Sequence, residues 1–375
     1  MHLNVLLLNL FPQIMPDCTP KSERVSSANR RCVAFDLVKM AMMLWVVWGH
    51  LEAYGIVEET RTICMDNAKI GVNMPVFFVM SGFFAASTFA KANWIKILCR
   101  SALYVWPHFT IPLTCALFWI IVGGMDIMSA INNVQLYWFL RTLAMIYLLC
   151  AVIYCFSRNN LMRWVLFVVT YGAMLFWPRP LRFWWCAQVI HMYPYFVFGL
   201  MVLSRRRIDS NPVISLACGV AFLAVSFFAG DFISLGMNFW QSSPYWESVL
   251  FDLRCFVAFF ARTVVGICGS IFVLFLANVV EKRIPWTRLL APLGLSSLGV
   301  YVLHEYPLIL VHKYASFTPA PAWSRWIIAI GWFLVCHFTV VMIKRSKYCR
   351  FFVFGDEDWL RARITQFALW RKETR

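Results

Sequence analysis

Charged residues are scarce in this chain of 375 residues. Only 14% of them are Asp, Glu, Lys or Arg, whereas 61% are hydrophobic, and the mean hydropathy is +0.68. A soluble domain usually has about a quarter of its residues charged and about half apolar. The composition therefore excludes an ordinary soluble enzyme and predicts an all-α protein that crosses a membrane several times.

Long polar stretches, in which a sizeable extramembrane domain could fold, are also lacking. The apolar runs predict a bundle of about ten transmembrane helices, since a helix needs about 20 residues to cross the hydrocarbon core. We divide the chain into an N-terminal segment (1–32), a membrane-embedded domain (33–344) and a basic tail (345–375) with an expected interfacial helix. The predicted spans are 33–51, 70–90, 102–122, 135–156, 161–178, 183–203, 212–232, 255–280, 289–311 and 325–344.

Acidic residues are few, with 18 Asp and Glu against 34 Lys and Arg and a formal net charge of +16. If the N-terminus is cytoplasmic, 24 of the basic residues fall in cytoplasmic segments and 6 in outer loops. This asymmetry follows the positive-inside rule and predicts that both termini are cytoplasmic in a multi-pass protein of the inner (plasma) membrane. We expect the basic excess to contact anionic lipid and not nucleic acid, because no base-stacking or groove-reading element accompanies it.

Cysteine and histidine patterns typical of disulfide scaffolds or metal centres are absent. None of the 13 cysteines forms a CxxC pair or a Cys/His cluster with metal-ligand spacing. Most of them lie in predicted spans, where they act as small apolar residues. The sequence therefore predicts neither a disulfide framework nor a metal site, and it leaves the oligomeric state open.

Charges are nevertheless present inside the first predicted span, "DLVKMAMMLWVVWGH" (36–50). Lys39 and His50 are 11 residues apart, about three turns plus 20°, so both lie on one helix face about 16.5 Å apart. Asp36 is three residues before Lys39 and is able to pair with it. Each residue also has a structural alternative. Lys39 could extend to the lipid headgroups, Asp36 could only neutralise the Lys39 charge, and His50 could only mark the outer interface. An acid at this depth needs protein or water around it, so the helix is predicted to line a polar passage.

Other ionisable residues inside predicted spans support a passage, although each could instead make a structural hydrogen bond between helices. They are Arg141, His191, Arg262, His304 and Glu305.

Four segments, in order, carry a resemblance to a known family. They read "FDLVKMAMMLWVVWGH" (35–50), "NMPVFFVMSGFF" (73–84), "YWFLRTL" (137–143) and "LGLSSLGVYVLHEYPL" (293–308). Together they resemble the integral-membrane acyltransferase family 3, bacterial O-acyltransferases of cell-surface glycans and some small molecules. The chain departs from the family pattern at Lys39, where many members have arginine. It also departs after span two, where Lys91, Lys96 and Arg100 replace the common arginine pair.

The resemblance implies an acyl-CoA donor, most often acetyl-CoA, as a co-substrate and no bound cofactor. Its phosphates are expected near Lys39, Lys96 and Arg100, beside Asp36. The acceptor is expected to be a hydroxyl of a cell-surface or lipid-linked glycan near His50 at the outer end of the passage.

A hydroxyl needs a base to become a good nucleophile, and an imidazole suits that task at neutral pH, so His50 is the expected general base. A transient acyl-histidine is the alternative role. Arg141 or Arg262 could stabilise the oxyanion. Asp36 is too far along the helix, about 21 Å, to orient His50. Glu305 or a backbone carbonyl is the better candidate.

The remaining motif residues are expected to shape or line the passage. Ser81, Arg262, Tyr301 and His304 are the candidate lining residues, with structural hydrogen bonding as an equal alternative for Tyr301 and His304. Within "MPVFFVMSGFF", Pro75 and Gly82 are expected to kink and pack the second span and not to contact substrate.

Two other functions remain as alternatives to an enzyme. A transporter or flippase for a glycan or small anion could use the same passage, although no matched pair of Gly/Pro-interrupted helices occurs in two halves. A membrane scaffold without catalysis would pair its buried charges internally.

Overall fold

The computed structural model describes residues 33–58, 63–122, 128, 137–157, 159–175, 184–230, 232, 253–314, 318–356, 359–360, 362–363 and 366. Regular secondary structure in these ranges is helical, and one isolated parallel bridge joins Val57 to Ala320. The all-α class is therefore confirmed. The predicted N-terminal segment, 1–32, lies outside the described residues, as does most of the chain after 356.

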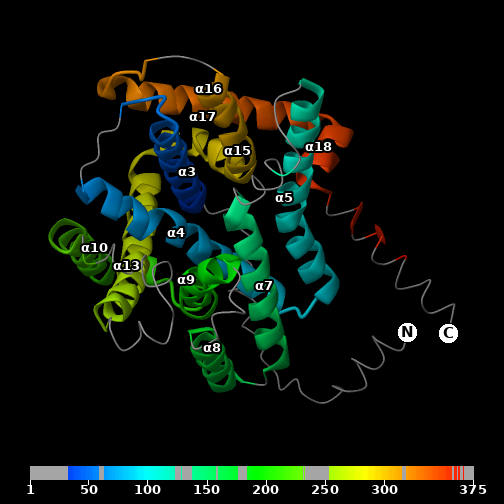
Figure 1. Cartoon of the computed structure of the whole chain (residues 1–375). Coiled ribbons are helices and arrows are strands. Elements are labelled where there is room, and N and C mark those ends of the chain that lie inside the picture. The colour runs from blue at the N-terminus through cyan, green and yellow to red at the C-terminus, as the bar shows by residue number, and fades with distance from the viewer. Residues whose placement is uncertain are drawn as a thin grey trace.

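The helices form one bundle (Figure 1). Their bounds are α3 (Val33–Ala53), α4 (Ile63–Phe89), α5 (Trp94–Val122), α7 (Trp138–Phe156), α8 (Asn160–Leu175), α9 (Trp184–Phe198), the π-helix η3 (Gly199–Leu203), η4 (Ile208–Ser210), α10 (Pro212–Phe228), α13 (Leu253–Arg283), η5 (Pro285–Leu289), α14 (Ala291–Leu295), α15 (Ser297–Leu303), α16 (Glu305–Tyr314), η6 (Ala322–Ser324), α17 (Arg325–Arg345) and α18 (Lys347–Phe354).

Five described segments are long and apolar enough to cross a membrane, and a sixth arises if one bent pair counts as a single span. They are Val33–Ala53, Gly71–Phe89, Trp138–Phe156, Phe256–Arg283 and Ala322–Arg345, with Pro285–Leu295 plus Ser297–Ile309 as the bent pair. Each of the ten predicted spans overlaps a helix, but α8, α10 and the segment Gln188–Leu203 are shorter apolar helices. A multi-pass helical membrane protein is thus confirmed, whereas the count of ten is not, and the side of the termini stays a prediction.

Helix α3 lies in the interior of the bundle. It packs against α4, α13, α14, α15, α16 and α17, and in Figure 1 it is enclosed between α4, α13 and α15. Most of its residues are buried, from Ala34 at its start to Leu51 near its end. The segment after α3 is also held, because Glu58 N donates to the Ala320 carbonyl (2.9 Å) just before α17. The helix with Lys39 and His50 is therefore held by several neighbouring helices along its length.

Close helix crossings depend on glycine. A Cβ on Gly82 of α4 would collide with the Phe196 carbonyl, and one on Gly199 of η3 would collide with the Val79 carbonyl. The two backbones therefore touch directly, as small residues permit at membrane helix interfaces. The expectation that Gly82 serves packing is confirmed.

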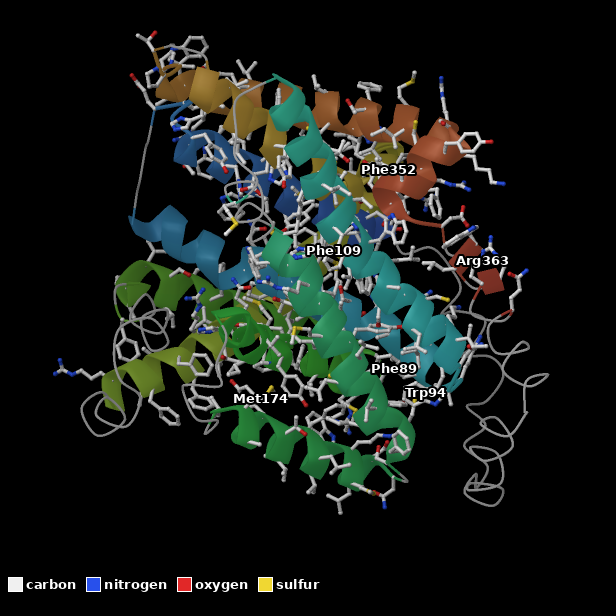
Figure 2. All side chains as sticks on the ribbon, turned by 45° about the vertical axis from the view of Figure 1, so that its right-hand side comes forward. Phe89, Trp94, Phe109, Met174, Phe352 and Arg363 are labelled. Carbon is white, nitrogen blue, oxygen red and sulfur yellow. The ribbon has the colours of Figure 1, made fainter. Side chains whose placement is uncertain are left out.

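The turn between α4 and α5 is closed by aromatic contacts with α7. The ring of Phe89 lies 5.9 Å from that of Tyr154, and the ring of Trp94 lies 6.0 Å from that of Phe156. Phe89 and Trp94 are seen close together at this end of the molecule (Figure 2). These contacts fix the end of α4 relative to α7.

The predicted span over 289–311 is not one straight helix, because it is bent by 45° between Leu295 and Ser297, at the junction of α14 and α15. A further interruption separates α15 from α16 at His304. Pro307 has no N–H to donate to the Leu303 carbonyl one turn earlier, and its ring opposes a continuous helix there. The helix accordingly stops after Leu303 and restarts at Glu305.

Carbonyl groups freed by this break need partners, since the membrane interior offers no water. Side chains supply them. Tyr137 Oη donates to the Val302 carbonyl (2.6 Å), and Trp332 Nε1 donates to the His304 carbonyl (3.1 Å). His304 Nδ1 lies 2.9 Å from the Tyr301 carbonyl. The side chains of Tyr137, Trp332 and His304 thus satisfy the backbone carbonyls at the break and stabilise it.

We expect Gly82→Ala to lower the free energy of unfolding by about 1–3 kcal/mol, because the added methyl group forces α4 away from η3. Gly172→Ala in α8 is the matched control, since an added Cβ there meets nothing within 4 Å. Thermal unfolding of both variants in detergent measures the difference. Equal stability of the two variants would contradict the close crossing.

Candidate active site

His50 and Glu305 form a hydrogen-bonded pair between α3 and α16. His50 Nδ1 lies 3.2 Å from Glu305 Oε1, and the side chains are 34% and 6% exposed, respectively. An ionised carboxylate can only accept, so Nδ1 carries the proton of the neutral imidazole. The other ring nitrogen, Nε2, is then left as a proton acceptor. The acid is thus buried, and the imidazole that it orients is partly exposed.

Tyr54 is a second donor to the same carboxylate, with its hydroxyl 3.0 Å from Glu305 Oε1. Burial and the nearby Glu305 charge raise the pKa of the Tyr54 phenol above its ordinary value, so it keeps its proton and remains a donor. His312 of α16 holds the Tyr54 backbone, with Nδ1 2.8 Å from the Tyr54 carbonyl. Two donors from the end of α3 thus converge on Glu305.

His304, immediately before Glu305, is fully buried and lies against His50 with ring centroids 4.9 Å apart. Its Nδ1 is 3.1 Å from the Val300 carbonyl and 2.9 Å from the Tyr301 carbonyl. Both partners are acceptors, so Nδ1 is protonated and Nε2 carries a lone pair. That Nε2 is buried and has no hydrogen-bond partner among the described residues.

Tyr301 connects this cluster to the start of α7. Its ring centroid lies 5.9 Å from that of His304 and 5.3 Å from that of Phe139. Arg141 lies in the first turn of α7, two residues after Phe139. The start of α7 is therefore beside the cluster, and Arg141 remains a candidate for stabilising negative charge there.

Lys39, at the opposite end of α3, pairs with Asp36 as their spacing predicts. Lys39 Nζ is 3.1 Å from Asp36 Oδ1, with Lys39 partly exposed and Asp36 buried. The ammonium group also lies 5.3 Å from the centroid of the Phe84 ring in α4. The Lys39 end of the helix thus presents a cation above a buried acid.

Arg100 and Lys96 of α5 were predicted to stand near Lys39. Arg100 Nη1 donates to Thr88 Oγ1 (2.8 Å), and Thr88 follows Phe84 by one turn of α4. Lys39 and Arg100 therefore contact consecutive turns of the same helix. Lys96 lies in the first turn of α5, where its backbone N–H donates to Asn93 Oδ1 (2.9 Å); no described contact joins its side chain to Lys39.

Two other predicted residues, Arg262 and Ser81, are not joined to the His50 cluster. Arg262 of α13 is buried, and its carbonyl accepts a hydrogen bond from Tyr195 of α9 (3.3 Å). Ser81 lies in α4 beside the Gly82 crossing. Within the described ranges no hydrogen bond or ion pair links either residue to His50, His304 or Glu305, so a role as lining residues stays a prediction.

Arg207 and Asp209 were missed by the sequence reasoning. Arg207 donates to both carboxylate oxygens of the fully buried Asp209 (2.9 and 2.8 Å), which also accepts from Asn278 Nδ2 (2.9 Å). The guanidinium lies 5.6 Å from the Phe35 ring centroid, one residue before Asp36. Nothing in "SRRRIDS" distinguishes Arg207 from the two arginines before it.

Tyr54 was also missed, but a signal existed. It follows His50 by four residues, the spacing that places two side chains on one helix face. Tyr54 lies beyond residue 51, where the first predicted span ends, so it was not counted among the residues inside a span.

The described residues thus place a partly exposed imidazole beside a buried carboxylate at one end of α3 and a partly exposed cation at the other end. Residues 33–342 match acyltransferase family 3, described as an acyltransferase domain. The chain belongs to this family.

Among curated proteins, the chain is 25% identical over 218 residues to the nodulation protein NolL of Sinorhizobium fredii (strain NBRC 101917 / NGR234). The match covers 52% of this chain and 56% of that protein, so the chain spans only about half the length of this relative. No solved structure matches the chain.

The different exposure of the two imidazoles predicts different chemical reactivity. Diethyl pyrocarbonate, which acylates accessible neutral imidazole nitrogen, is expected to modify His50 and to leave the fully buried His304 unmodified. Peptide mass spectrometry of the folded protein in detergent checks this, with the denatured protein as the control in which both react. Equal modification of both histidines in the folded protein would contradict the described burial.

Proposed function

We propose that the protein is a membrane O-acyltransferase of the inner membrane. It transfers an acyl group, most simply acetyl, from cytoplasmic acyl-CoA to a hydroxyl of a cell-surface or lipid-linked glycan. The single observation that carries this proposal is the His50–Glu305 hydrogen bond, in which a buried carboxylate orients a partly exposed imidazole.

His50 acts as the general base in the proposed reaction. Nε2 takes the proton of the acceptor hydroxyl while the hydroxyl oxygen attacks the thioester carbonyl carbon. Glu305 stabilises the resulting imidazolium through Nδ1, as the acid does in other acid–histidine pairs. The tetrahedral intermediate then loses the CoA thiolate, which receives the proton from His50. The products are an ester and free CoA thiol.

Negative charge develops on the thioester oxygen during this step, and a nearby cation lowers its cost. Arg141 is our candidate, because α7 begins beside the His304 and Tyr301 rings. Tyr54 has a positioning role, since its hydroxyl bonds to Glu305.

The donor is proposed to bind at the Lys39 end of α3. Lys39 and Arg100 contact consecutive turns of α4 and offer two positive charges for phosphate groups. Lys96 and the buried Asp36 complete the proposed donor end, with Asp36 holding the Lys39 side chain. From here the pantetheine arm would extend along α3 for about 16.5 Å to reach His50.

We expect His50→Ala to abolish transfer, because loss of a general base costs about 10²–10⁴ in rate. The test uses a strain that lacks the gene, complemented with wild type, His50→Ala or His337→Ala. NMR of the isolated surface polysaccharide measures O-acetyl groups, and immunoblots check protein levels in the membrane. His337 is a matched control, because it lies on α17 with its Nδ1 2.6 Å from Ser296 Oγ, and no described contact joins it to His50, His304 or Glu305.

Restoration of the acetyl signal by wild type and His337→Ala, but not by His50→Ala, supports the enzyme and its base. Full restoration by His50→Ala would exclude His50 as the base. An acetyl signal that gene deletion leaves unchanged would count against this glycan class as the acceptor.

Lys39→Gln is expected to weaken acetyl-CoA binding by about tenfold or more, since a charge-assisted hydrogen bond contributes about 1.5–3 kcal/mol. Microscale thermophoresis of the purified protein at two salt concentrations measures the affinity and its salt dependence. Lys347→Gln in α18 is the control for loss of one positive charge. An unchanged affinity for Lys39→Gln would overturn the donor-binding role.

A further inference from the structure

We propose that His50, His304 and Glu305 form a binding site for Zn²⁺, and that bound Zn²⁺ inhibits acyl transfer. The inhibitory part rests on the proposed role of His50 as the base. The zinc site itself rests only on the geometry of the three side chains.

Three potential metal ligands converge at the junction of α3 and α16. One ligand atom from each of the three residues lies within 4.8 Å of the others. Zinc bonds to imidazole nitrogen and carboxylate oxygen are about 2.0–2.2 Å long, so tetrahedral ligands lie about 3.5 Å apart. His50 Nδ1 and Glu305 Oε1, 3.2 Å apart, are already near this spacing, and the whole set lies within about 1.3 Å of it.

The state of His304 is an independent observation that points to a ligand. Its Nδ1–H donates to the Val300 and Tyr301 carbonyls, which fixes the ring and the tautomer. Metal-binding histidines are typically held in this way, by a hydrogen bond from the second ring nitrogen to a carbonyl or carboxylate. The remaining Nε2 lone pair is fully buried and has no hydrogen-bond partner in the described part of the chain. A buried acceptor without a partner is costly, and a metal ion would satisfy it.

The chemistry of the ligands selects the metal. Two imidazoles and one carboxylate suit Zn²⁺, which often has three protein ligands and one open position. Mg²⁺ and Ca²⁺ prefer six or more oxygen ligands, which this cluster does not offer. His50 is 34% exposed, whereas Glu305 and His304 are buried, so an ion would enter past His50.

Occupation of this site would remove the base. Zinc binds a lone pair, so coordination of His50 Nδ1 displaces the proton that now bonds to Glu305. A neutral imidazole bound to metal through Nδ1 carries its one proton on Nε2. That nitrogen can no longer accept a proton from an acceptor hydroxyl. Zinc and general-base catalysis are therefore mutually exclusive at this cluster.

Zinc binding is tested on the purified full-length chain in detergent, after metal removal with a chelator and without acyl donor or acceptor. Zn²⁺ is titrated in competition with a fluorescent zinc indicator, and Mg²⁺ is the comparison ion. We expect one Zn²⁺ per chain and no Mg²⁺ binding. His304→Ala should weaken Zn²⁺ binding by more than about 100-fold, the upper range for loss of an outer-shell partner.

Two further variants keep the test decisive if His304→Ala fails to fold. His50→Ala alters a partly exposed side chain, and Glu305→Gln keeps the side-chain size; both should weaken Zn²⁺ binding comparably. His337→Ala is the matched control, because the described contact of its Nδ1 is with Ser296 Oγ (2.6 Å), and this variant should bind as wild type does. Absence of Zn²⁺ binding by wild type, or binding that survives all three ligand substitutions, would overturn the site.

Inhibition is measured separately, in membrane vesicles supplied with labelled acetyl-CoA. We expect Zn²⁺ to stop label transfer to the glycan and a chelator to restore it. Zinc binding with unchanged transfer would overturn the inhibitory part alone. Zinc binding by a chain that transfers no acetyl group in the absence of zinc would count against the proposed function and leave the metal site standing.

Discussion

The hydrogen bond between the His50 imidazole and the Glu305 carboxylate determines how the centre of this bundle is arranged. A buried carboxylate in a membrane protein is costly unless it meets donors or positive charge. Glu305 meets both His50 and Tyr54, and it lies in the first turn of α16, where the helix dipole favours an anion. The end of α3, the break after α15 and the start of α16 therefore depend on one another.

The same arrangement recurs at the opposite end of α3. Asp36 is buried beneath the partly exposed Lys39, and the fully buried Asp209 is held by the more exposed Arg207. In each pair the acid is internal and the basic group reaches outward. Burial of the acid fixes the geometry, and exposure of its partner leaves a group that a ligand can approach. The fold thus presents an imidazole at one end of a single interior helix and cations at the other.

Much of this arrangement was predictable from spacing along the chain. The Asp36–Lys39 pair and the packing role of Gly82 follow from helix periodicity and residue size, and the structure agrees with them. Hydropathy and helix periodicity did not predict where a proline interrupts a helix. Pro307 interrupts the ninth predicted span, and hydropathy averages across such a break because apolar residues lie on both sides of it.

The sequence by itself determined the class of protein, the polar face of the first span and the family, because composition, period and motif order are properties of the chain. The sequence left Glu305 or a backbone carbonyl as the partner of His50, and only the tertiary structure decided between them, since Glu305 is 255 positions away. It also decided that Arg262 packs beside Tyr195 while His304 lies against His50. Helix packing and the break before Glu305 set these contacts, and neither leaves a periodic signal in the sequence.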